Sequence, residues 1–102
     1  MHPLIELKLP EIVSLCRRHH VRRLEVFGSA ASGRFDPQRS DVDFLVEYLP
    51  QASHGFRGDY FALQEGLEAV FGRGVDLVMT EAVRSPYFLR GIAKERTVIY
   101  EA

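Results

Sequence analysis

The sequence contains a single cysteine, Cys16, among its 102 residues. One cysteine cannot form an internal disulfide, and the spacing of cysteine and histidine residues matches no zinc site. An excess of basic charge is also lacking, because 13 basic residues against 14 acidic ones leave a net charge of −1 with histidine neutral. A chain without surplus positive charge is a poor match for the phosphate backbone, so we expect no direct nucleic-acid binding.

Long hydrophobic runs, repeats and low-complexity tracts are missing as well. Residues 1–13 mix charged and apolar side chains, which is typical of neither a signal peptide nor a membrane span. We therefore expect a cytoplasmic protein with no membrane partner. The length of the chain predicts one domain over residues 1–102, and its hydrophobic content of 46% argues against disorder.

The periodicity of apolar residues predicts helices and strands in alternation. Helices are predicted over 10–19, 60–71 and 85–94, and strands over 22–27, 41–48, 75–79 and 97–100. Pro10 suits the first turn of the first helix, and Asp59 is expected to cap the second. This alternation predicts an α/β fold, with a mixed sheet of about four strands and helices packed against it.

Basic and aromatic residues indicate no separate site. The adjacent His19 and His20 are expected to point to different sides of a helix, which argues against joint metal binding. We interpret the surrounding arginines as a solvated helix end; they are Arg17, Arg18, Arg22 and Arg23. The aromatic residues of the second half either form a partner surface or, on general frequency, belong to the core; they are Phe56, Tyr60, Phe61, Tyr87 and Phe88.

Two aspartates, Asp41 and Asp43, interrupt one of the predicted strands. Strand alternation places both carboxylates on one face, with their Cα atoms about 7 Å apart. Both stay ionised only when a cation lies between them, and Mg²⁺ prefers oxygen ligands of this kind. The alternative is a strand end whose exposed face happens to carry acids.

Two further features point to the same chemistry. Gly28-Ser29 follows directly on the first predicted strand, where a glycine turn and free N–H groups attract phosphate oxygens. Asp76 interrupts the apolar strand 75–79, and an isolated acid in a buried strand is costly unless it is paired or binds a metal. The alternatives are an ordinary turn capped by Ser29 and an Asp76 paired with an arginine.

The runs Gly28-Ser29-Ala30-Ala31-Ser32-Gly33 and Ser40-Asp41-Val42-Asp43 resemble the signature of the DNA polymerase beta nucleotidyltransferase superfamily. The nearest likeness is to its minimal nucleotidyltransferase (MNT) branch, usually antitoxins encoded beside a HEPN-domain RNase toxin. The resemblance extends from the first predicted helix through Asp76 and implies a small nucleotidyltransferase fold. Relatives commonly carry arginine where this chain has Ser32, a difference that bears on affinity for the polyphosphate.

The resemblance implies transfer of AMP from ATP, with pyrophosphate leaving, by a two-metal mechanism. It assigns Asp41 and Asp43 to two Mg²⁺ ions. It assigns Asp76 to the catalytic ion and to removal of the proton from the attacking hydroxyl. The residues that it implies for binding the nucleoside triphosphate are Gly28, Ser29 and Ser40.

So short a chain has no residues left for a domain that binds the acceptor, so the acceptor is expected on another chain. The resemblance suggests a tyrosine or other hydroxyl of a HEPN toxin in a hetero-oligomer, and it also allows a homodimer. The first alternative is a binding module of the same fold, weakly active or inactive, that neutralises the toxin by masking it. A second is a transferase acting on a small molecule such as an aminoglycoside, which the missing acceptor domain disfavours.

Overall fold

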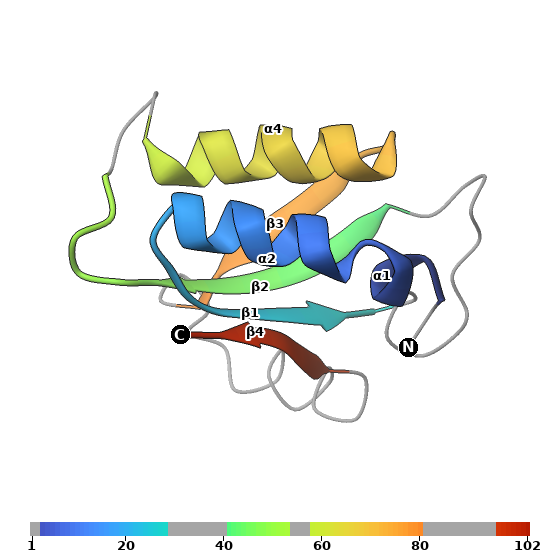
Figure 1. The fold of residues 1–102 in the computed structure, drawn as a ribbon, viewed down its shortest axis with the longest axis horizontal. Coiled ribbons are helices and arrows are strands. Elements are labelled where there is room, and N and C mark those ends of the chain that lie inside the picture. Colours follow the sequence, from blue (N-terminus) through green and yellow to red (C-terminus); the bar gives the residue numbers. More distant parts are fainter. Residues whose placement is uncertain (1–2, 29–40, 54–57, 81–95) are drawn as a thin grey trace.

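The computed structural model describes residues 3–28, 41–53, 58–80 and 96–102 of the chain. Helix α1 (Pro3–Leu7) and helix α2 (Leu9–Arg18) lead into strand β1 (Val21–Phe27) (Figure 1). Strand β2 (Val42–Tyr48) is followed by helix α4 (Asp59–Phe71), strand β3 (Val75–Met79) and strand β4 (Thr97–Glu101). The predicted elements within these ranges are therefore confirmed, with ends that shift by one residue.

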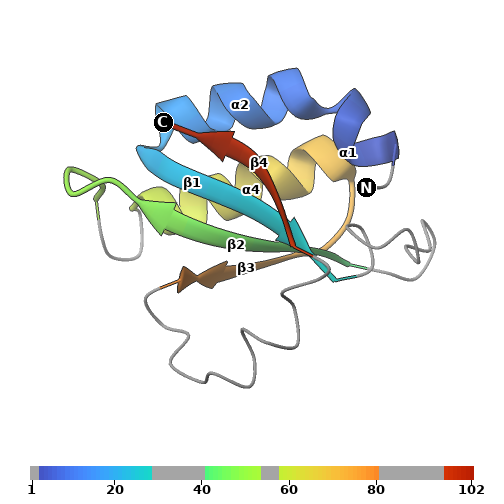
Figure 2. The same ribbon diagram turned by 90° about the horizontal axis from the view of Figure 1, so that it is seen from below.

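The strands form one mixed four-stranded sheet in the order β3-β2-β1-β4, which confirms the expected α/β fold (Figure 2). Strand β1 pairs antiparallel with both β2 and β4, whereas β2 and β3 are parallel. A parallel pair needs a crossover connection, and α4 provides it between β2 and β3. Helices α2 and α4 lie side by side on the same face of the sheet (Figure 1).

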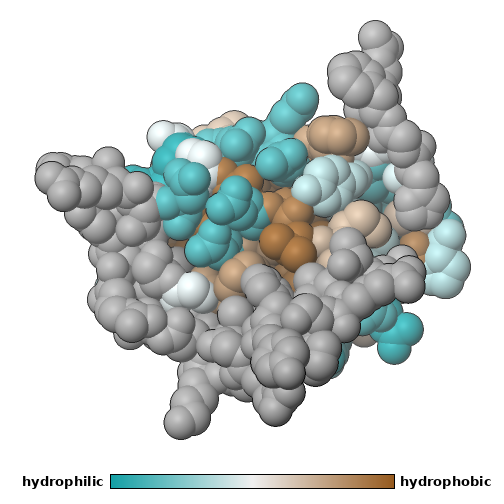
Figure 3. Space-filling view, turned by 180° about the vertical axis from the view of Figure 1, so that it is seen from behind, coloured by the Kyte–Doolittle hydropathy of each residue, from teal (hydrophilic) through white to brown (hydrophobic). Residues whose placement is uncertain are grey.

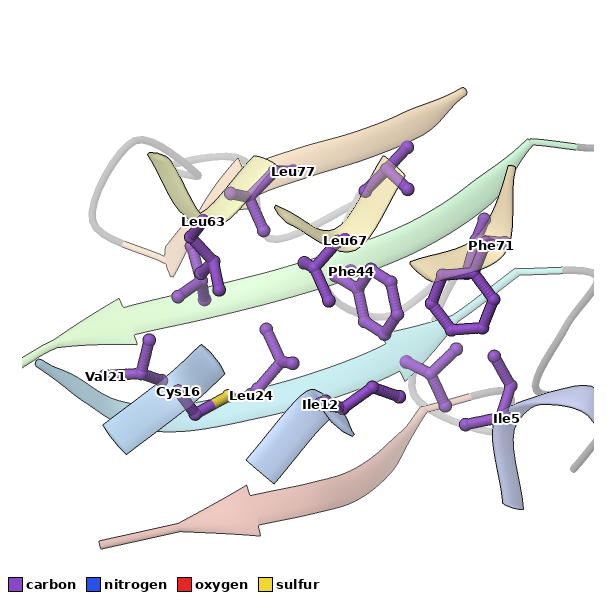
Figure 4. Packing of buried hydrophobic residues seen from close by; sticks show 14 of the residues in the cluster. Ile5, Ile12, Cys16, Val21, Leu24, Phe44, Leu63, Leu67, Phe71 and Leu77 are labelled. Atoms are coloured by element: carbon purple, nitrogen blue, oxygen red, sulfur yellow. The ribbon is translucent and has the colours of Figure 1, made fainter. Parts of the chain in front are cut away.

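The core lies between this helical layer and the sheet (Figure 4). Alternate residues of β2 face the helices, as the strand pattern predicts, and α4 meets them with a stripe at helical spacing. The fully or almost fully buried members from these two elements are Val42, Phe44, Val46, Leu63, Leu67 and Phe71. Each such side chain contributes about 1.5–3 kcal/mol through its removal from water.

The helix ends follow from local residue types, with one omission in the prediction. Pro10 lies in the first turn of α2, where its missing N–H costs nothing. Gly72 ends α4 in the left-handed conformation, at φ 64°, and its N–H donates to the carbonyl of Glu68. The sequence did not predict α1, because five residues are too few to show a helical period; Ile5 nevertheless anchors it in the core.

The prediction that Asp59 caps α4 is wrong. Gly58 occupies the N-cap position, and Asp59 is the first helical residue. Its carboxylate instead accepts a hydrogen bond of 2.8 Å from the backbone N–H of Ser53. It also accepts hydrogen bonds from Nδ1 of His19 at 3.3 Å and Nδ1 of His20 at 3.2 Å. Asp59 thus ties the start of α4 to the turn between α2 and β1.

The two histidines do not point to different sides of a helix, which corrects that expectation. Helix α2 ends at Arg18, so His19 is already its C-cap. His20 adopts a positive φ of 59°, and this left-handed residue turns its ring back toward the carboxylate that His19 also contacts. Helical spacing could not predict the directions of His19 and His20, because the helix ends one residue before them.

Replacing Asp59 with asparagine is expected to destabilise the fold by about 2 kcal/mol at pH 7. Burial acts to raise the pKa of Asp59, but the hydrogen bonds from Ser53, His20 and His19 outweigh it and lower this pKa below its ordinary value of 3.8. A carboxylate with a lowered pKa stabilises the fold above its unfolded-state pKa, and this stability is lost as the pH falls through the folded value.

Urea unfolding at pH 7 and at pH 3 measures this difference, which should shrink at the lower pH. The exposed Glu11 forms only a surface pair with Lys8 at 3.8 Å, so Glu11→Gln is a control that should change stability by less than about 0.5 kcal/mol at either pH. Equal effects of the two substitutions at pH 7 would contradict a stabilising role for Asp59.

The remaining surface of the described ranges carries hydrophobic residues beside hydrophilic ones (Figure 3). Large exposed hydrophobic side chains come from three different elements and are Leu7, Phe61 and Val98.

Cys16 is buried, and burial raises the pKa of its thiol to about 12. No helix in the described part of the chain is both long enough and apolar enough to cross a membrane. The predicted helix over 85–94 lies outside the described residues, as do Phe56, Tyr87 and Phe88.

Candidate functional site

The predicted site residues that the structure describes lie at one end of the sheet because of the strand directions. Strands β2, β3 and β4 run the same way and β1 runs opposite to them, so the end of β1 lies beside the starts of the other three. Asp43 of β2 is the Cα partner of Asp76 in β3 and of Phe27 in β1. Gly28 follows Phe27 directly, so the glycine turn and the acidic residues meet at this end.

The acidic side chains also share one face of the sheet. Phe44 and Leu77, the next residues along the two strands, belong to the core beneath α2 and α4. Strand alternation therefore directs Asp43 and Asp76 to the face that these helices leave uncovered. A side-chain hydrogen bond joins Asp43 to Asp76, and the charge of Asp41 acts on Asp43 as well. The strand register therefore brings Asp43 and Asp76 together, and Asp41 lies close enough for its charge to act on Asp43.

Burial and acidic neighbours together disfavour the ionised form of Asp43. Burial raises the pKa of Asp43 to about 6, helped by the hydrogen bond to Asp76 and by the negative charges of Asp76 and Asp41. A raised pKa means that the folded chain disfavours the ionised form of this carboxyl. A divalent cation would favour the ionised form instead, because its positive charge offsets the negative charges of the carboxylates.

Two glycines give the carboxylates room. At Gly28, with φ 72°, an added Cβ would lie 2.6 Å from Oδ2 of Asp43. At Gly74, in the turn before β3, an added Cβ would lie 2.8 Å from Oδ1 of Asp41. Any side chain at either position would displace a carboxylate or be displaced by it. Gly28 is therefore required here both for its backbone conformation and for space around Asp43.

Asp76 departs from one expectation. The sequence suggested an acid within a buried strand, whereas the structure leaves Asp76 exposed, at the edge strand of the sheet. Because Asp76 is exposed, its charge costs little in lost hydration. Burial therefore gives no reason for Asp76 to bind a metal or to form an ion pair. The case for a role of Asp76 in the site then rests on its place beside Asp43.

The predicted nucleotide-binding residues Ser29 and Ser40 lie outside the described residues. Among the residues that the structure does describe, no three Asp, Glu, His or Cys side chains form a group able to hold a metal ion by themselves. Mg²⁺ at a nucleotide site commonly takes one or two carboxylates and completes its shell with substrate phosphates and water. Asp41 and Asp43, with Asp76 beside them, fit that incomplete type of donor set.

One buried charged residue was missed by the sequence reasoning. Glu25 of β1 is only 2% exposed, and its partners are Arg96, through the arginine Nε, and Arg23, whose Nε lies 2.9 Å away. The signal was available, since an acid interrupts the apolar run Leu24-Glu25-Val26-Phe27 just as Asp43 interrupts its own strand. It was overlooked because no motif included it.

A surface groove of about 490 Å³ lies elsewhere, between α2 and α4. The close approach of the helices depends on Gly66, where an added Cβ would lie 2.7 Å from Cδ2 of Leu15. Because these helices cover the opposite face of the sheet from Asp43 and Asp76, the groove is separate from the acidic residues. The candidate site is therefore the sheet end and not this groove.

Comparison with known proteins agrees with this geometry. The family model described as "Nucleotidyltransferase domain" matches residues 9–99, nearly the whole chain. The chain belongs to the nucleotidyltransferase domain family. The matched range includes Gly28 and both strands that carry the carboxylates.

Two relatives are similar to this nucleotidyltransferase along most of their length. The protein adenylyltransferase MntA of Thermococcus cleftensis is 37% identical over 106 residues, which cover 92% of this chain and 96% of that protein. A solved structure assigned to the minimal nucleotidyltransferases is 29% identical with a TM-score of 0.74, covering 94% of each chain. The small nucleotidyltransferase fold and the enzyme class are thus established.

A more distant solved structure shares the fold. It contains a tri-AMPylated HEPN toxin of Shewanella oneidensis in complex with an MNT antitoxin. The match has a TM-score of 0.65 at 17% identity and covers 95% of this nucleotidyltransferase and 72% of that chain. At this identity the likeness concerns the fold alone.

Proposed function

We propose that this nucleotidyltransferase is an antitoxin that transfers AMP from ATP to a hydroxyl of a partner HEPN RNase toxin and thereby neutralises it. The observation that carries the proposal is the pairing of Asp43 with Asp76 beside Gly28, with Asp41 close enough to act on Asp43 through its charge. The name of the adenylyltransferase relative supports the reaction, and the AMPylated HEPN toxin in the more distant complex supports the acceptor. A tyrosine is the acceptor hydroxyl that we expect.

The carboxylates suit two Mg²⁺ ions, held by Asp41 and Asp43 with Asp76 on the catalytic ion. Bound Mg²⁺ supplies neutralisation of the charge that develops on the attacking and leaving oxygens. The fit rests on the surroundings of Asp43: burial raises its pKa to about 6, helped by the hydrogen bond to Asp76 and by the charges of Asp76 and Asp41. It rests also on the space that Gly28 and Gly74 leave around two of the carboxylates.

In the reaction the acceptor oxygen attacks the α-phosphorus of ATP. A new P–O bond forms, the bond from the α-phosphorus to the bridging oxygen breaks, and pyrophosphate leaves with that electron pair. Asp76 is exposed and can take the proton from the attacking hydroxyl. Gly28, Ser29 and Ser40 bind the triphosphate, the first through a backbone that approaches closely because no side chain intervenes. The chain contributes mainly positioning and charge compensation.

The test is label transfer to the HEPN protein encoded beside this chain. With Mg²⁺ and ATP labelled on the α-phosphate, label is expected on the toxin, its RNase activity should fall, and a chelator should stop both. ATP labelled on the γ-phosphate should transfer nothing. Label from the γ-phosphate would contradict adenylyl transfer, and neutralisation of the toxin without any label would favour masking by a binding module.

A further inference from the structure

The buried Glu25 lies on the same face of the sheet as the acidic group. Its Cα partner in β2 is Leu45, and Phe27, two residues farther along β1, pairs with Asp43. With 2% of its surface exposed, Glu25 would be costly without cations beside it. Nothing in the proposed reaction uses this carboxylate directly, so its retention in the interior calls for another explanation.

Two arginines meet this single acid. Arg23 lies 2.9 Å from Oε1 of Glu25 and also 3.5 Å from Glu101, so it is shared between two carboxylates. Arg96 donates its Nε to Oε2 of Glu25. The two arginines balance the two carboxylates Glu25 and Glu101, and the contact with Glu25 fixes Arg96 in place.

The position of Arg96 connects this group with the glycine turn. Arg96 immediately precedes Thr97, which is the Cα partner of Val26 in β1. Continuing the antiparallel register by one residue places Arg96 beside Phe27, next to Gly28. Asp43 pairs with Phe27 from the other side, so Arg96 and Asp43 lie two strand spacings apart, about 10 Å at their Cα atoms. Phe27, which Gly28 follows directly, thus lies between Asp43 and this arginine.

We propose that Arg96 binds the β- or γ-phosphate of the nucleoside triphosphate, with Glu25 as the positioning residue that holds its guanidinium. This assignment rests on the proposed function, because it needs a triphosphate seated between Asp43 and the turn at Gly28. A triphosphate whose α-phosphate lies at the carboxylates spans several ångströms toward its γ end. The strand order puts Arg96 on the β1 side of the site, where the glycine turn is expected to hold the phosphates.

The chemistry of the guanidinium suits this role. Arginine has five N–H donors in a rigid fork, and Glu25 engages Arg96 through Nε. The terminal nitrogens can then form the paired hydrogen bonds that arginine makes with phosphate oxygens. The side chain of Arg96 is 30% exposed, so a ligand can reach it. Anchoring by Glu25 removes the conformational freedom that a flexible surface arginine would lose on binding.

The experiment compares affinities for ATP and AMP, measured by calorimetry on the full chain with Mg²⁺ present. Arg96→Ala is expected to weaken ATP binding about tenfold to a hundredfold and to leave AMP binding unchanged, because AMP lacks the β- and γ-phosphates. The ratio of the two affinities is independent of how much protein is folded. Equal losses for ATP and AMP, or no loss for either, would overturn the role of Arg96.

Arg22→Ala is the matched control. Arg22 is 62% exposed, pairs with Glu47 at 3.3 Å and lies at the opposite end of β1, so its removal deletes the same charge away from the site. It should change neither affinity. A loss of ATP binding equal to that of Arg96→Ala would mean that general charge, and not this position, attracts the nucleotide. A wild-type chain that binds no ATP would overturn the proposed function and this inference together.

Two further variants test positioning. Glu25→Gln keeps the shape and one acceptor oxygen but loses the charge that fixes Arg96, so ATP binding should weaken about threefold to tenfold with AMP binding unchanged. Arg96→Lys keeps a cation and should recover part of the ATP affinity lost in Arg96→Ala. If Glu25→Gln lowers the melting temperature yet leaves the ATP to AMP ratio at the wild-type value, Glu25 is structural and does not position Arg96.

Discussion

Replacing both Asp41 and Asp43 with asparagine is expected to reduce AMP transfer at least about 1,000-fold. Asparagine is nearly the same size but carries no charge, so the variant keeps the shape of the site and loses its hold on Mg²⁺. Metal ions contribute several kcal/mol of transition-state stabilisation in such displacements, and each 1.36 kcal/mol corresponds to a factor of ten in rate. Transfer of α-phosphate label to the HEPN toxin measures the loss.

The same double variant is expected to remain folded and to gain about 1 kcal/mol of stability at pH 7 without metal. Burial and the neighbouring Asp76 and Asp41 raise the pKa of Asp43 to about 6, so its ionised form destabilises the fold above that pH. This cost is absent once the pH falls below the ordinary value of 3.8, where wild type and variant should unfold alike.

Asp59→Asn is the matched control for that experiment. It makes the same chemical change at the other end of the sheet, where the pKa of the aspartate is lowered instead of raised. It should lose stability at pH 7 and still transfer AMP. The double variant should thus gain stability and lose activity, whereas Asp59→Asn should lose stability and keep activity. A double variant that transfers AMP at the wild-type rate would contradict the assignment of Asp41 and Asp43.

Gly28→Ala is expected to lower AMP transfer about 100-fold. The added methyl group would lie 2.6 Å from Oδ2 of Asp43, closer than two such atoms can approach, so the carboxylate or the turn must shift. A displacement of about 1 Å at a reacting group can cost a factor of 100. The φ of 72° adds strain for any residue with a side chain, about 1 kcal/mol of stability.

Gly72→Ala separates these two causes. Gly72 has a similar φ of 64°, but an added Cβ there has no atom within 4 Å. Its alanine variant should lose about the same stability in urea unfolding and keep its transferase activity. If both variants lose activity alike, backbone strain or global destabilisation is responsible, and contact between Gly28 and Asp43 is not what matters.

The fold and part of the site could be predicted because they depend on neighbours in sequence. Strand alternation in β2 separates Asp43 from Val42, Phe44 and Val46, which are buried in the core. Pro10 in the first turn of α2 and Gly72 as the C-cap of α4 follow from backbone preferences of single residues. The assignment of Mg²⁺ and ATP to these residues stays a prediction.

The errors have a common physical origin. Asp59 has the residue type and position of a helix cap, but its carboxylate finds three stronger donors that come from Ser53, His19 and His20. Competing partners brought close by folding decided its role. Asp76 similarly looked buried from its apolar neighbours, whereas its strand lies at the edge of the sheet and is exposed on that face.

By itself, the sequence determined that this chain folds as alternating helices and strands and that carboxylates interrupt two apolar strands beside a glycine turn. Only the tertiary structure decided which carboxylates meet, because strand order and register depend on pairing between distant residues. It alone set Asp43 opposite Asp76 and buried Glu25 between two arginines. Local preference specifies which way a side chain faces along its strand, and packing between strands specifies what it faces.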